Sequence, residues 1–549
     1  MRRGLNPFWS FPPFVSSRDR ACREPVSRDP DRGDLSIRRL GKLDGYSRRT
    51  ELRAGVMALA GALLLTAPVH AAEEKKTTVE KTETSESELP PLPTDKTVKQ
   101  SAVIGGRSIA YNATVGKITA RDDKGKAIGE VTYTAYTVSG ASGGSGRPVT
   151  FAFNGGPGAA SVYLNLGAVG PKRVQFGAQG DAPSDAPIAT DNPNSWLDFT
   201  DLVFIDPIGT GFSRSLTDEE ATKKAFYAND PDIKYLSKVV YDWLVKNGRL
   251  RSKKYIMGES YGGYRGPRIA YELQSQIGVG VNGLILVSPY LDPAAEDTGS
   301  ALSPMPWMVT LPSMAAAQLE RQHQLTPEAM AQVEAYTRGE FAADLLKGRS
   351  DPQATQRLSA NVSRLTGLDP ALVQRLGGRV DIGTYLRELR RAEGRIGSVY
   401  DSNVTAFDPF PWSSDQQSND PILDALIAPT TSAMVDFVTR EVGWKTDARY
   451  HALSYAVNQA WDRGRPKDDP VTDLRKAVAN DPKMAVLIAH GWDDLSCPYF
   501  ASKLLVDQMP ANGMADRVRV AVYPGGHMFY SREDSGAAFK RDARAVYGG

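Results

Sequence analysis

The sequence predicts an α/β fold in which a mostly parallel central sheet is flanked by helices. Two observations predict it: short apolar, β-rich segments recur along the chain, and amphipathic segments with helical spacing lie between several of them. A strand, a helix and a second strand in succession build a parallel pair with a right-handed crossover. The 549 residues allow one large core with an inserted lobe.

Six short apolar segments are predicted to be strands buried on both faces, because each is a continuous run with few polar residues. They are residues 149–153, 202–205, 255–257, 284–287, 485–489 and 518–522. Alternating apolar and polar residues at 118–121 and 130–138 predict two further strands, joined by the polar turn 122–126.

Helical periodicity is clearest at 232–245, where Ile233, Leu236, Val240 and Trp243 share one face. The stretch 292–446 breaks the alternation of strands and helices. Its helical, Ala- and Arg-rich segments are 314–323, 327–335 and 382–392. We expect an inserted helical lobe, which in this architecture lies over the strand ends where a site forms.

The first 71 residues have the pattern of an export signal. Arg48, Arg49 and Arg53 precede the apolar segment 54–67, and small residues up to Ala71 form a cleavage site. The paired arginines leave both the general secretory and the twin-arginine route open. We therefore expect an exported protein, periplasmic or extracellular.

The rest of the chain divides by composition. Residues 1–46, ahead of the signal, are Arg-rich and aperiodic, which favours a start codon assigned too early. Residues 72–97 are mostly Glu, Lys, Thr and Pro and predict a disordered linker. The predicted core then comprises 98–291 and 447–549, with the lobe 292–446 between them.

Composition excludes several classes of function. A net charge of +2 gives no reason to expect nucleic acid as a partner. Cys22 and Cys497 are the only cysteines and there are five histidines, so we expect no disulfide scaffold, metal or other cofactor. No apolar run after residue 71 approaches the roughly 20 residues of a membrane span, so no integral membrane segment is expected.

The segment GESYG at 258–262 is the strongest local indication of chemistry. Glycines two residues before and after Ser260 allow a sharp turn from strand to helix, which exposes the hydroxyl at the rim of the sheet. Such a motif also occurs in ordinary glycine-rich turns. The predicted strand before it and the helical segment 264–274 after it favour a nucleophile.

A serine hydroxyl needs a base, and His527 follows two glycines in the loop after the last predicted strand. The remaining histidines are interpreted as part of the signal or as structural: His70, His323, His451 and His490. In folds with this type of serine turn, the acid lies between serine and histidine in the sequence. Asp493 and Asp494 both qualify, and spacing alone does not choose between them.

The segment NGGPG at 154–158 follows the predicted strand 149–153. Its glycines leave backbone N–H groups free to approach a developing oxyanion. A phosphate-binding loop would need a Lys-Ser/Thr pair or a different glycine spacing, and neither is present.

Together these motifs resemble the serine carboxypeptidases, an α/β-hydrolase family, and indicate an exported member of bacterial type. The matching segments, in the family's order, are FNGGPGAAS at 153–161, GAVGP at 167–171, NPNSW at 192–196, DPIGTGFS at 206–213, GESYGG at 258–263, GWDDLSCP at 491–498 and GGHMF at 525–529. The resemblance implies an α/β-hydrolase fold with a helical cap lobe. It also implies a peptidase that releases C-terminal residues of peptides or proteins without a cofactor.

The resemblance also implies roles for individual residues. Ser260 is the expected nucleophile and His527 the base, and the family's spacing selects Asp494 over Asp493 as the acid.

Four further residues take roles from the same resemblance. The backbone N–H groups of Gly156 and Tyr261 form the expected oxyanion hole. Asn154 and Glu259 are expected to hold the C-terminal carboxylate of the substrate. A glutamate can do so only while a proton is shared between the two carboxyl groups, which favours acidic pH.

Three alanines depart from the family pattern. Ala152 replaces a usual Trp and Ala168 a usual Glu, both associated with carboxylate recognition, and Ala159 replaces a usual disulfide cysteine. The first two favour an alternative, an esterase or an aminopeptidase of related fold. A non-catalytic binding protein is a further alternative, against which the complete Ser, Asp and His positions argue. Cys497 is interpreted either as a site residue near the histidine loop or as a small buried filler.

Overall fold

The computed structural model describes residues 90–138, 146–174, 189–292, 302–413, 420–464, 469–510 and 517–548. The predicted export signal and most of the predicted linker lie outside the described residues. The first strand begins at Lys96 and so includes the last two residues of that linker, because Lys96–Ile104 pairs along its whole length with the strand that follows.

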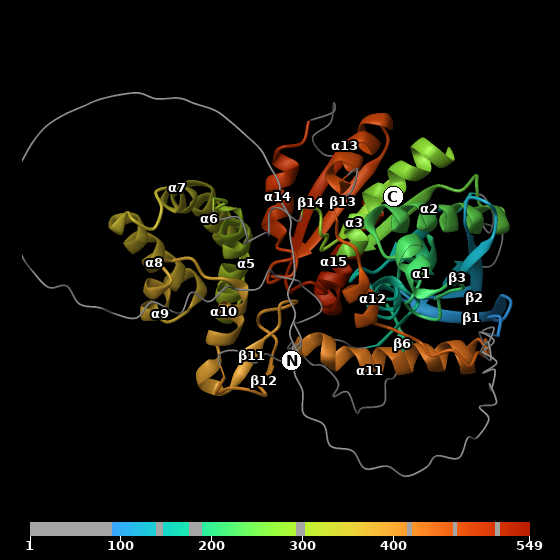
Figure 1. The fold of residues 1–549 in the computed structure, drawn as a ribbon, viewed down its shortest axis with the longest axis horizontal. Coiled ribbons are helices and arrows are strands. Elements are labelled where there is room, and N and C mark those ends of the chain that lie inside the picture. The colour runs from blue at the N-terminus through green and yellow to red at the C-terminus, as the bar shows by residue number, and fades with distance from the viewer. Residues whose placement is uncertain are drawn as a thin grey trace, which may run out of the picture. The chain divides into compact units, whose positions relative to one another are not determined.

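A ten-stranded sheet forms the centre of the fold. Its strands are β1 (Lys96–Ile104), β2 (Arg107–Arg121), β3 (Ala127–Val138), β4 (Val149–Phe153), β7 (Asp201–Ile205), β8 (Arg214–Ser215), β9 (Lys254–Glu259), β10 (Gly283–Val287), β13 (Ala485–Gly491) and β14 (Val518–Tyr523). They are ordered β1-β2-β3-β7-β4-β9-β10-β13-β14, with β8 paired to β3. Figure 1 labels the strands at the two ends of this order, β1, β2 and β3 at one end and β13 and β14 at the other. The strands from β7 to β14 are parallel, and β1, β2 and β3 are antiparallel. The predicted mostly parallel sheet, with all six apolar segments as strands, is confirmed, but β14 is not buried on both faces because it lies at the edge of the sheet.

The two faces of the sheet are covered separately because alternate side chains along a strand point to opposite faces. Phe151 and Phe153 of β4 pack in one cluster with α2 (Asn229–Lys246), α3 (Tyr261–Glu272) and α13 (Pro470–Asn480). Ala152, between them, faces a second cluster that includes residues of α11 (Pro421–Asp436) and α15 (Glu533–Val546). This layering explains why the central strands have no polar face.

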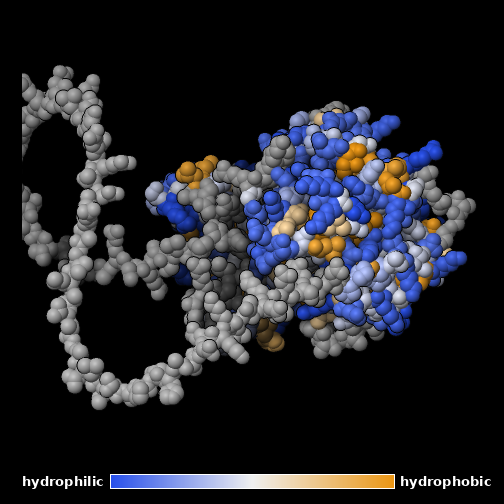
Figure 2. All heavy atoms as spheres, turned by 45° about the vertical axis from the view of Figure 1, so that its right-hand side comes forward, coloured by the Kyte–Doolittle hydropathy of each residue, from blue (hydrophilic) through white to orange (hydrophobic). Residues whose placement is uncertain are grey.

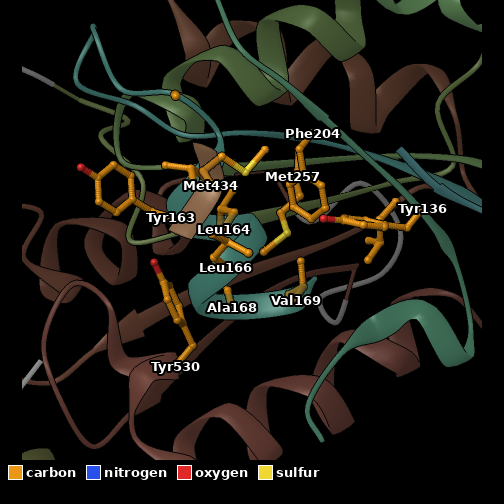
Figure 3. Packing of buried hydrophobic residues seen from close by; sticks show 14 of the residues in the cluster. Tyr136, Tyr163, Leu164, Leu166, Ala168, Val169, Phe204, Met257, Met434 and Tyr530 are labelled. Carbon is orange, nitrogen blue, oxygen red and sulfur yellow. The ribbon is translucent and has the colours of Figure 1, made fainter. Parts of the chain in front are cut away.

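Figure 3 shows part of the second cluster, where Leu164, Leu166 and Val169 pack near Met257 and Phe204. These leucines and the valine lie on a π-helical turn, Leu164–Val169, that follows β4. On the face drawn in Figure 2, hydrophilic residues dominate the described surface, and hydrophobic residues gather only in small groups.

Several helices begin in the same way, with an Asp or Thr whose side chain caps the helix and a proline in the first turn. Thr326, Asp351, Asp369, Asp420 and Asp469 each accept a hydrogen bond from a backbone N–H of the first turn. The N–H groups of the first turn have no partner within the helix. The capping oxygen accepts a hydrogen bond from one of them, and a proline in the first turn has no N–H that could stay unpaired. These local signals fix where the helices begin.

The lobe has its own hydrophobic cluster, which also includes Tyr499 and Phe500 of α14 (Tyr499–Asp507). Its helices are α5 (Met305–Arg321), α6 (Pro327–Tyr336), α7 (Ala342–Leu346), α8 (Pro352–Thr366), α9 (Pro370–Arg375) and α10 (Ile382–Glu388). The three segments predicted to be helical fall on α5, α6 and α10, although α5 ends at Arg321 and α10 ends at Glu388. A short hairpin of β11 (Arg395–Gly397) and β12 (Thr405–Phe407) follows.

The remaining short elements connect the larger ones. They are α1 (Glu219–Phe226), α12 (Tyr455–Ala460), β5 (Lys172–Arg173), β6 (Thr190–Asp191) and the short helical turns Trp196–Asp198, Leu273–Ile277, Thr337–Phe341, Arg391–Glu393, Phe437–Glu441 and Phe529–Ser531.

Helix α11 corrects one expectation. With the turn that follows, it forms an apolar helix of 21 residues, Pro421–Glu441, with mean hydropathy 1.3, long and apolar enough by length and composition to cross a membrane. The expectation that no such run follows residue 71 was therefore wrong. Half of this helix is buried inside the protein, and Leu426, Met434 and Phe437 pack in the cluster on the sheet, which accounts for its apolar composition.

Candidate active site

Ser260 lies at the sharp turn between β9 and α3. Its backbone has φ 59° and ψ −121°, a region that side-chain-bearing residues rarely adopt and that strains the turn. Its N–H donates to the carbonyl of Val287 at the end of β10 (3.0 Å). A Cβ atom on Gly258 would lie 1.9 Å from the carbonyl oxygen of Gly262, so the turn requires glycine there. The predicted strand–serine–helix turn is present.

His527 follows β14, and its Nδ1 atom lies 2.9 Å from Oδ2 of Asp494, in the loop after β13. The other carboxylate oxygen, Oδ1, accepts the backbone N–H groups of Ser496 (2.8 Å) and Cys497 (3.0 Å). His527 and Asp494 are both buried. The geometry therefore brings Asp494 to the imidazole and leaves Nε2 as the ring nitrogen that can exchange a proton.

The surroundings of His527 favour its charged form. Burial alone would lower the pKa of His527, but the charge and hydrogen bond of Asp494 outweigh burial and raise that pKa above its ordinary value. The ring packs edge-on against Tyr400 at a centroid distance of 5.1 Å, and the Tyr400 carbonyl accepts the backbone N–H of His527. The Oγ of Ser288 donates to the His527 carbonyl (2.9 Å), so the loop is held on both sides.

Ser260 and His527 line the same cavity, which is open to solvent on one side. Its other lining residues are Asn154, Gly155, Gly156, Ala159, Tyr163, Glu259, Tyr400, Leu423, Leu453 and Met528. The loops after β4, β9 and β14 meet there, beside the point where the strand order reverses between β4 and β9. Ligands bind at this kind of position in open parallel sheets.

Asn154 and Glu259 form a buried pair in this cavity. The Asn154 amide nitrogen donates to Oε2 of Glu259 (3.0 Å), and the Tyr530 hydroxyl donates to the same oxygen (2.8 Å). Burial raises the pKa of Glu259 to about 7, although these two hydrogen bonds and the charge of His527 oppose that rise. Glu259 therefore carries a proton at acidic pH.

The two predicted oxyanion donors lie on adjoining segments. Gly156 lines the cavity with φ 99°, a conformation that suits glycine. A Cβ atom on Gly155 would lie 2.5 Å from the backbone nitrogen of Tyr261, the first residue of α3. The glycine loop thus runs against the N-terminus of α3, where the helix dipole also favours negative charge. Their role in catalysis stays a prediction.

Asp493 belongs to a different network. Arg532 pairs with Glu320 of α5, lies 3.0 Å from Asp401 and lies 3.8 Å from Asp493. Burial, the Asp401 charge and Glu320 raise the pKa of Asp493 well above its ordinary value. Burial would also raise the pKa of Glu320, but hydrogen bonds from Asp493 and Arg532 bring it down to about 2. This cluster joins the lobe to the histidine loop.

Several lining residues were missed by the sequence analysis. Tyr163 and Met528 lie in or beside the motif segments and were not singled out. Tyr400, Leu423 and Leu453 come from the long insertion and the segment after it, where no motif marks them. Only tertiary packing brings these three to the cavity.

The sheet order, the strained serine turn and the buried histidine–aspartate pair define an α/β-hydrolase. The sequence profile described as serine carboxypeptidase matches residues 133–539. The chain therefore belongs to the serine carboxypeptidase family, and the predicted family is confirmed.

Individual relatives match shorter segments. The chain is 33% identical over 153 residues to the pheromone-processing carboxypeptidase KEX1 of Yarrowia lipolytica, covering 27% of this chain and 23% of that protein. It is 27% identical over 215 residues to serine carboxypeptidase-like 36 of Arabidopsis thaliana, covering 38% of each. The matches thus span well under half the length of these relatives. Both are eukaryotic, so they give no support to the prediction of a bacterial type.

A solved structure agrees in fold. The prohormone-processing carboxypeptidase Kex1(delta)p of Saccharomyces cerevisiae superposes with a TM-score of 0.52 at 15% identity, covering 80% of this chain and 91% of that one. At this identity the likeness concerns the fold, and the predicted α/β-hydrolase fold is confirmed.

Proposed function

We propose that the protein is a serine carboxypeptidase that releases C-terminal residues through an acyl-enzyme on Ser260. The observation that carries the proposal is that Ser260 and a buried His527–Asp494 pair meet at one cavity in a chain of this family. Serine hydrolysis requires a nucleophile, a base in reach and a group that orients the base.

The steps follow from the positions of these groups. Ser260 Oγ attacks the carbonyl carbon of the last peptide bond while His527 Nε2 takes the hydroxyl proton. The backbone N–H groups of Gly156 and Tyr261 stabilise the oxyanion, and the imidazolium gives its proton to the leaving amino group. Water, deprotonated by His527, then hydrolyses the ester and restores Ser260. Asp494 holds the imidazole in place throughout.

Recognition of the chain end is assigned to Asn154 and Glu259. Protonated Glu259 donates a hydrogen bond to the substrate carboxylate, and Asn154 holds Glu259 in place through its 3.0 Å hydrogen bond. With its pKa raised to about 7, Glu259 supplies this donor at acidic pH.

A fluorophosphonate probe tests the nucleophile. The wild-type protein should be labelled, and Ser260→Ala should not. Ser275→Ala is the control, because Ser275 is an exposed serine on the turn Leu273–Ile277 after α3, and it should be labelled like the wild type. Labelling that persists in Ser260→Ala would remove Ser260 from the proposed role.

An esterase or an aminopeptidase of the same fold is the second candidate, favoured by Ala152 and Ala168. Both alanines are buried among apolar residues, so neither adds a polar group for a carboxylate. Comparing an N-blocked peptide with its C-terminal amide, a free-amine dipeptide and a short ester separates these activities. A carboxypeptidase prefers the blocked peptide with a free carboxylate.

We also propose that the protein is exported, to the periplasm or beyond the cell, and is of bacterial type. The charged and apolar segments ahead of Ala71 support export. Expression in a bacterial host, followed by fractionation and N-terminal sequencing, should yield an exported form that starts at Ala72. A protein retained in the cytoplasm with an intact N-terminus would contradict export.

A further inference from the structure

The hydroxyl of Tyr163 is a polar group for which the proposed mechanism has no role. Tyr163 is 5% exposed, and its hydroxyl oxygen is buried without a hydrogen-bond partner among the residues that the structure describes. The same residue lines the cavity that contains Ser260 and His527. Buried hydroxyls usually have a partner, and because this one belongs to a residue that lines the cavity, a bound ligand can supply it.

Tyr163 is held next to the proposed carboxylate site. It directly precedes the turn Leu164–Val169, and the N–H of Leu164 donates to Oδ1 of Asn154 (2.9 Å). Figure 3 shows Tyr163 and Tyr530 at the same edge of the hydrophobic cluster. Burial, with the charges of Tyr455 and Glu259, raises the pKa of Tyr163, so its hydroxyl remains a hydrogen-bond donor at any physiological pH.

The other polar groups nearby are largely occupied. The Asn154 side chain already donates to Glu259 and accepts from Leu164. Oε2 of Glu259 accepts two hydrogen bonds, so a proton on this acid resides on Oε1. In the described part of the chain, no lysine or arginine lines the cavity. The side-chain donors left for an entering carboxylate include the protonated Glu259, the second amide hydrogen of Asn154 and the hydroxyls of Tyr163 and Tyr400.

We propose that the Tyr163 hydroxyl donates a hydrogen bond to the C-terminal carboxylate of the bound peptide. It thereby supplies a recognition contact that Ala152 and Ala168 do not offer. The inference rests on the proposed carboxypeptidase activity and names a specificity-determining residue for it. A hydrogen bond to a charged acceptor is among the stronger ones, so it favours a free carboxylate over a C-terminal amide.

Tyr163→Phe tests the inference because it removes only the hydroxyl. The kcat/KM for an N-blocked dipeptide with a free carboxylate should fall about 10- to 100-fold, mainly through a higher KM. The kcat/KM for the same dipeptide as a C-terminal amide should change by less than about threefold. The acid-to-amide ratio, which is kcat/KM for the free acid divided by kcat/KM for the amide, should therefore fall. A merely structural role would lower both values together.

Tyr450→Phe is the matched control. Tyr450 is also buried with a hydroxyl that has no partner among the described residues, but it does not line the cavity. Its acid-to-amide ratio should equal that of the wild type. As a second measurement, calorimetry in a Ser260→Ala background should show the Kd of the free-acid dipeptide rising about 10- to 100-fold on adding Tyr163→Phe.

The possible failures are distinct. If the wild-type protein hydrolyses the free-acid dipeptide and Tyr163→Phe keeps the wild-type ratio and Kd, the inference is wrong and the proposed function stands. If the wild-type protein hydrolyses neither dipeptide, the proposed function is refuted and the inference with it.

Discussion

Replacing Asp494 with asparagine should reduce turnover far more than the same change at Asp493. Oδ1 of Asp494 accepts two backbone N–H groups, so an asparagine would keep its carbonyl oxygen there and turn its amide nitrogen toward His527 Nδ1. The amide would then donate to Nδ1 and force the imidazole proton onto Nε2. An imidazole protonated at Nε2 cannot accept the serine proton, and we expect kcat to fall about 10⁴-fold.

The same change at Asp493 is expected to be mild. Its raised pKa indicates that Asp493 carries a proton in its cluster with Glu320 and Arg532, and asparagine resembles a protonated aspartate in shape. We expect kcat to stay within about fivefold of the wild type, which is under about 1 kcal/mol of barrier.

The assay is the kcat of both variants on an N-blocked dipeptide with a free carboxylate, with thermal melts to show that each is folded. In Asp494→Asn, only the smaller effects of the Glu259 and Asp420 charges still oppose burial, so the pKa of His527 should fall and the acid limb of the residual activity should move to lower pH. Equal losses in the two variants, or a greater loss in Asp493→Asn, would refute this reasoning.

Three further predictions concern the turn, the cavity and the buried acids. Gly258→Ala places a methyl group 1.9 Å from the Gly262 carbonyl oxygen, so urea titrations should show a free energy of unfolding lower by about 1–3 kcal/mol or more. Gly280→Ala is the control, because the space around Gly280 is open, and it should leave the free energy of unfolding unchanged. KM for a free-acid peptide should rise above pH about 7 as Glu259 loses its proton, and KM for a short ester should stay flat; a parallel rise for both would contradict the assignment. Burial raises the pKa values of Asp206 and Glu259 to about 7, so the folded protein holds these two protons more tightly than the unfolded chain does. Their contribution to the free energy of unfolding is therefore complete at pH values below the unfolded-state pKa values, and it is lost as the pH rises through 7. Tm should therefore be higher at pH 5.5 than at pH 8.5, and the difference in Tm between these two pH values should be smaller in Asp206→Asn than in the wild type. A variant with the same difference in Tm as the wild type would count against this explanation.

The central strands could be predicted because they are buried on both faces and therefore form continuous apolar runs. β1 was not predicted, since most of its residues are exposed or half-buried and it reads as an extension of the polar linker. Helix α11 was placed within the lobe by its position in the chain, whereas its apolar residues pack on the sheet. Which surface an apolar helix covers depends on tertiary packing and is not encoded in its own periodicity.

Ser260 and His527 could be singled out from short segments because each lies in a glycine-rich turn directly after a strand. Asp493 and Asp494 could not be separated by local pattern, since adjacent residues in one loop point to different neighbours only once the fold forms. Tyr400 and Leu423 reach the cavity from the long insertion, so their contribution depends on contacts between segments far apart in the chain.

The most direct test of the account is mass spectrometry of a peptide with an acetylated N-terminus and a free C-terminus after incubation with the protein. The account predicts a ladder of masses that shortens one residue at a time from the C-terminus and is absent with Ser260→Ala. Products cut internally or an unchanged C-terminus would contradict it.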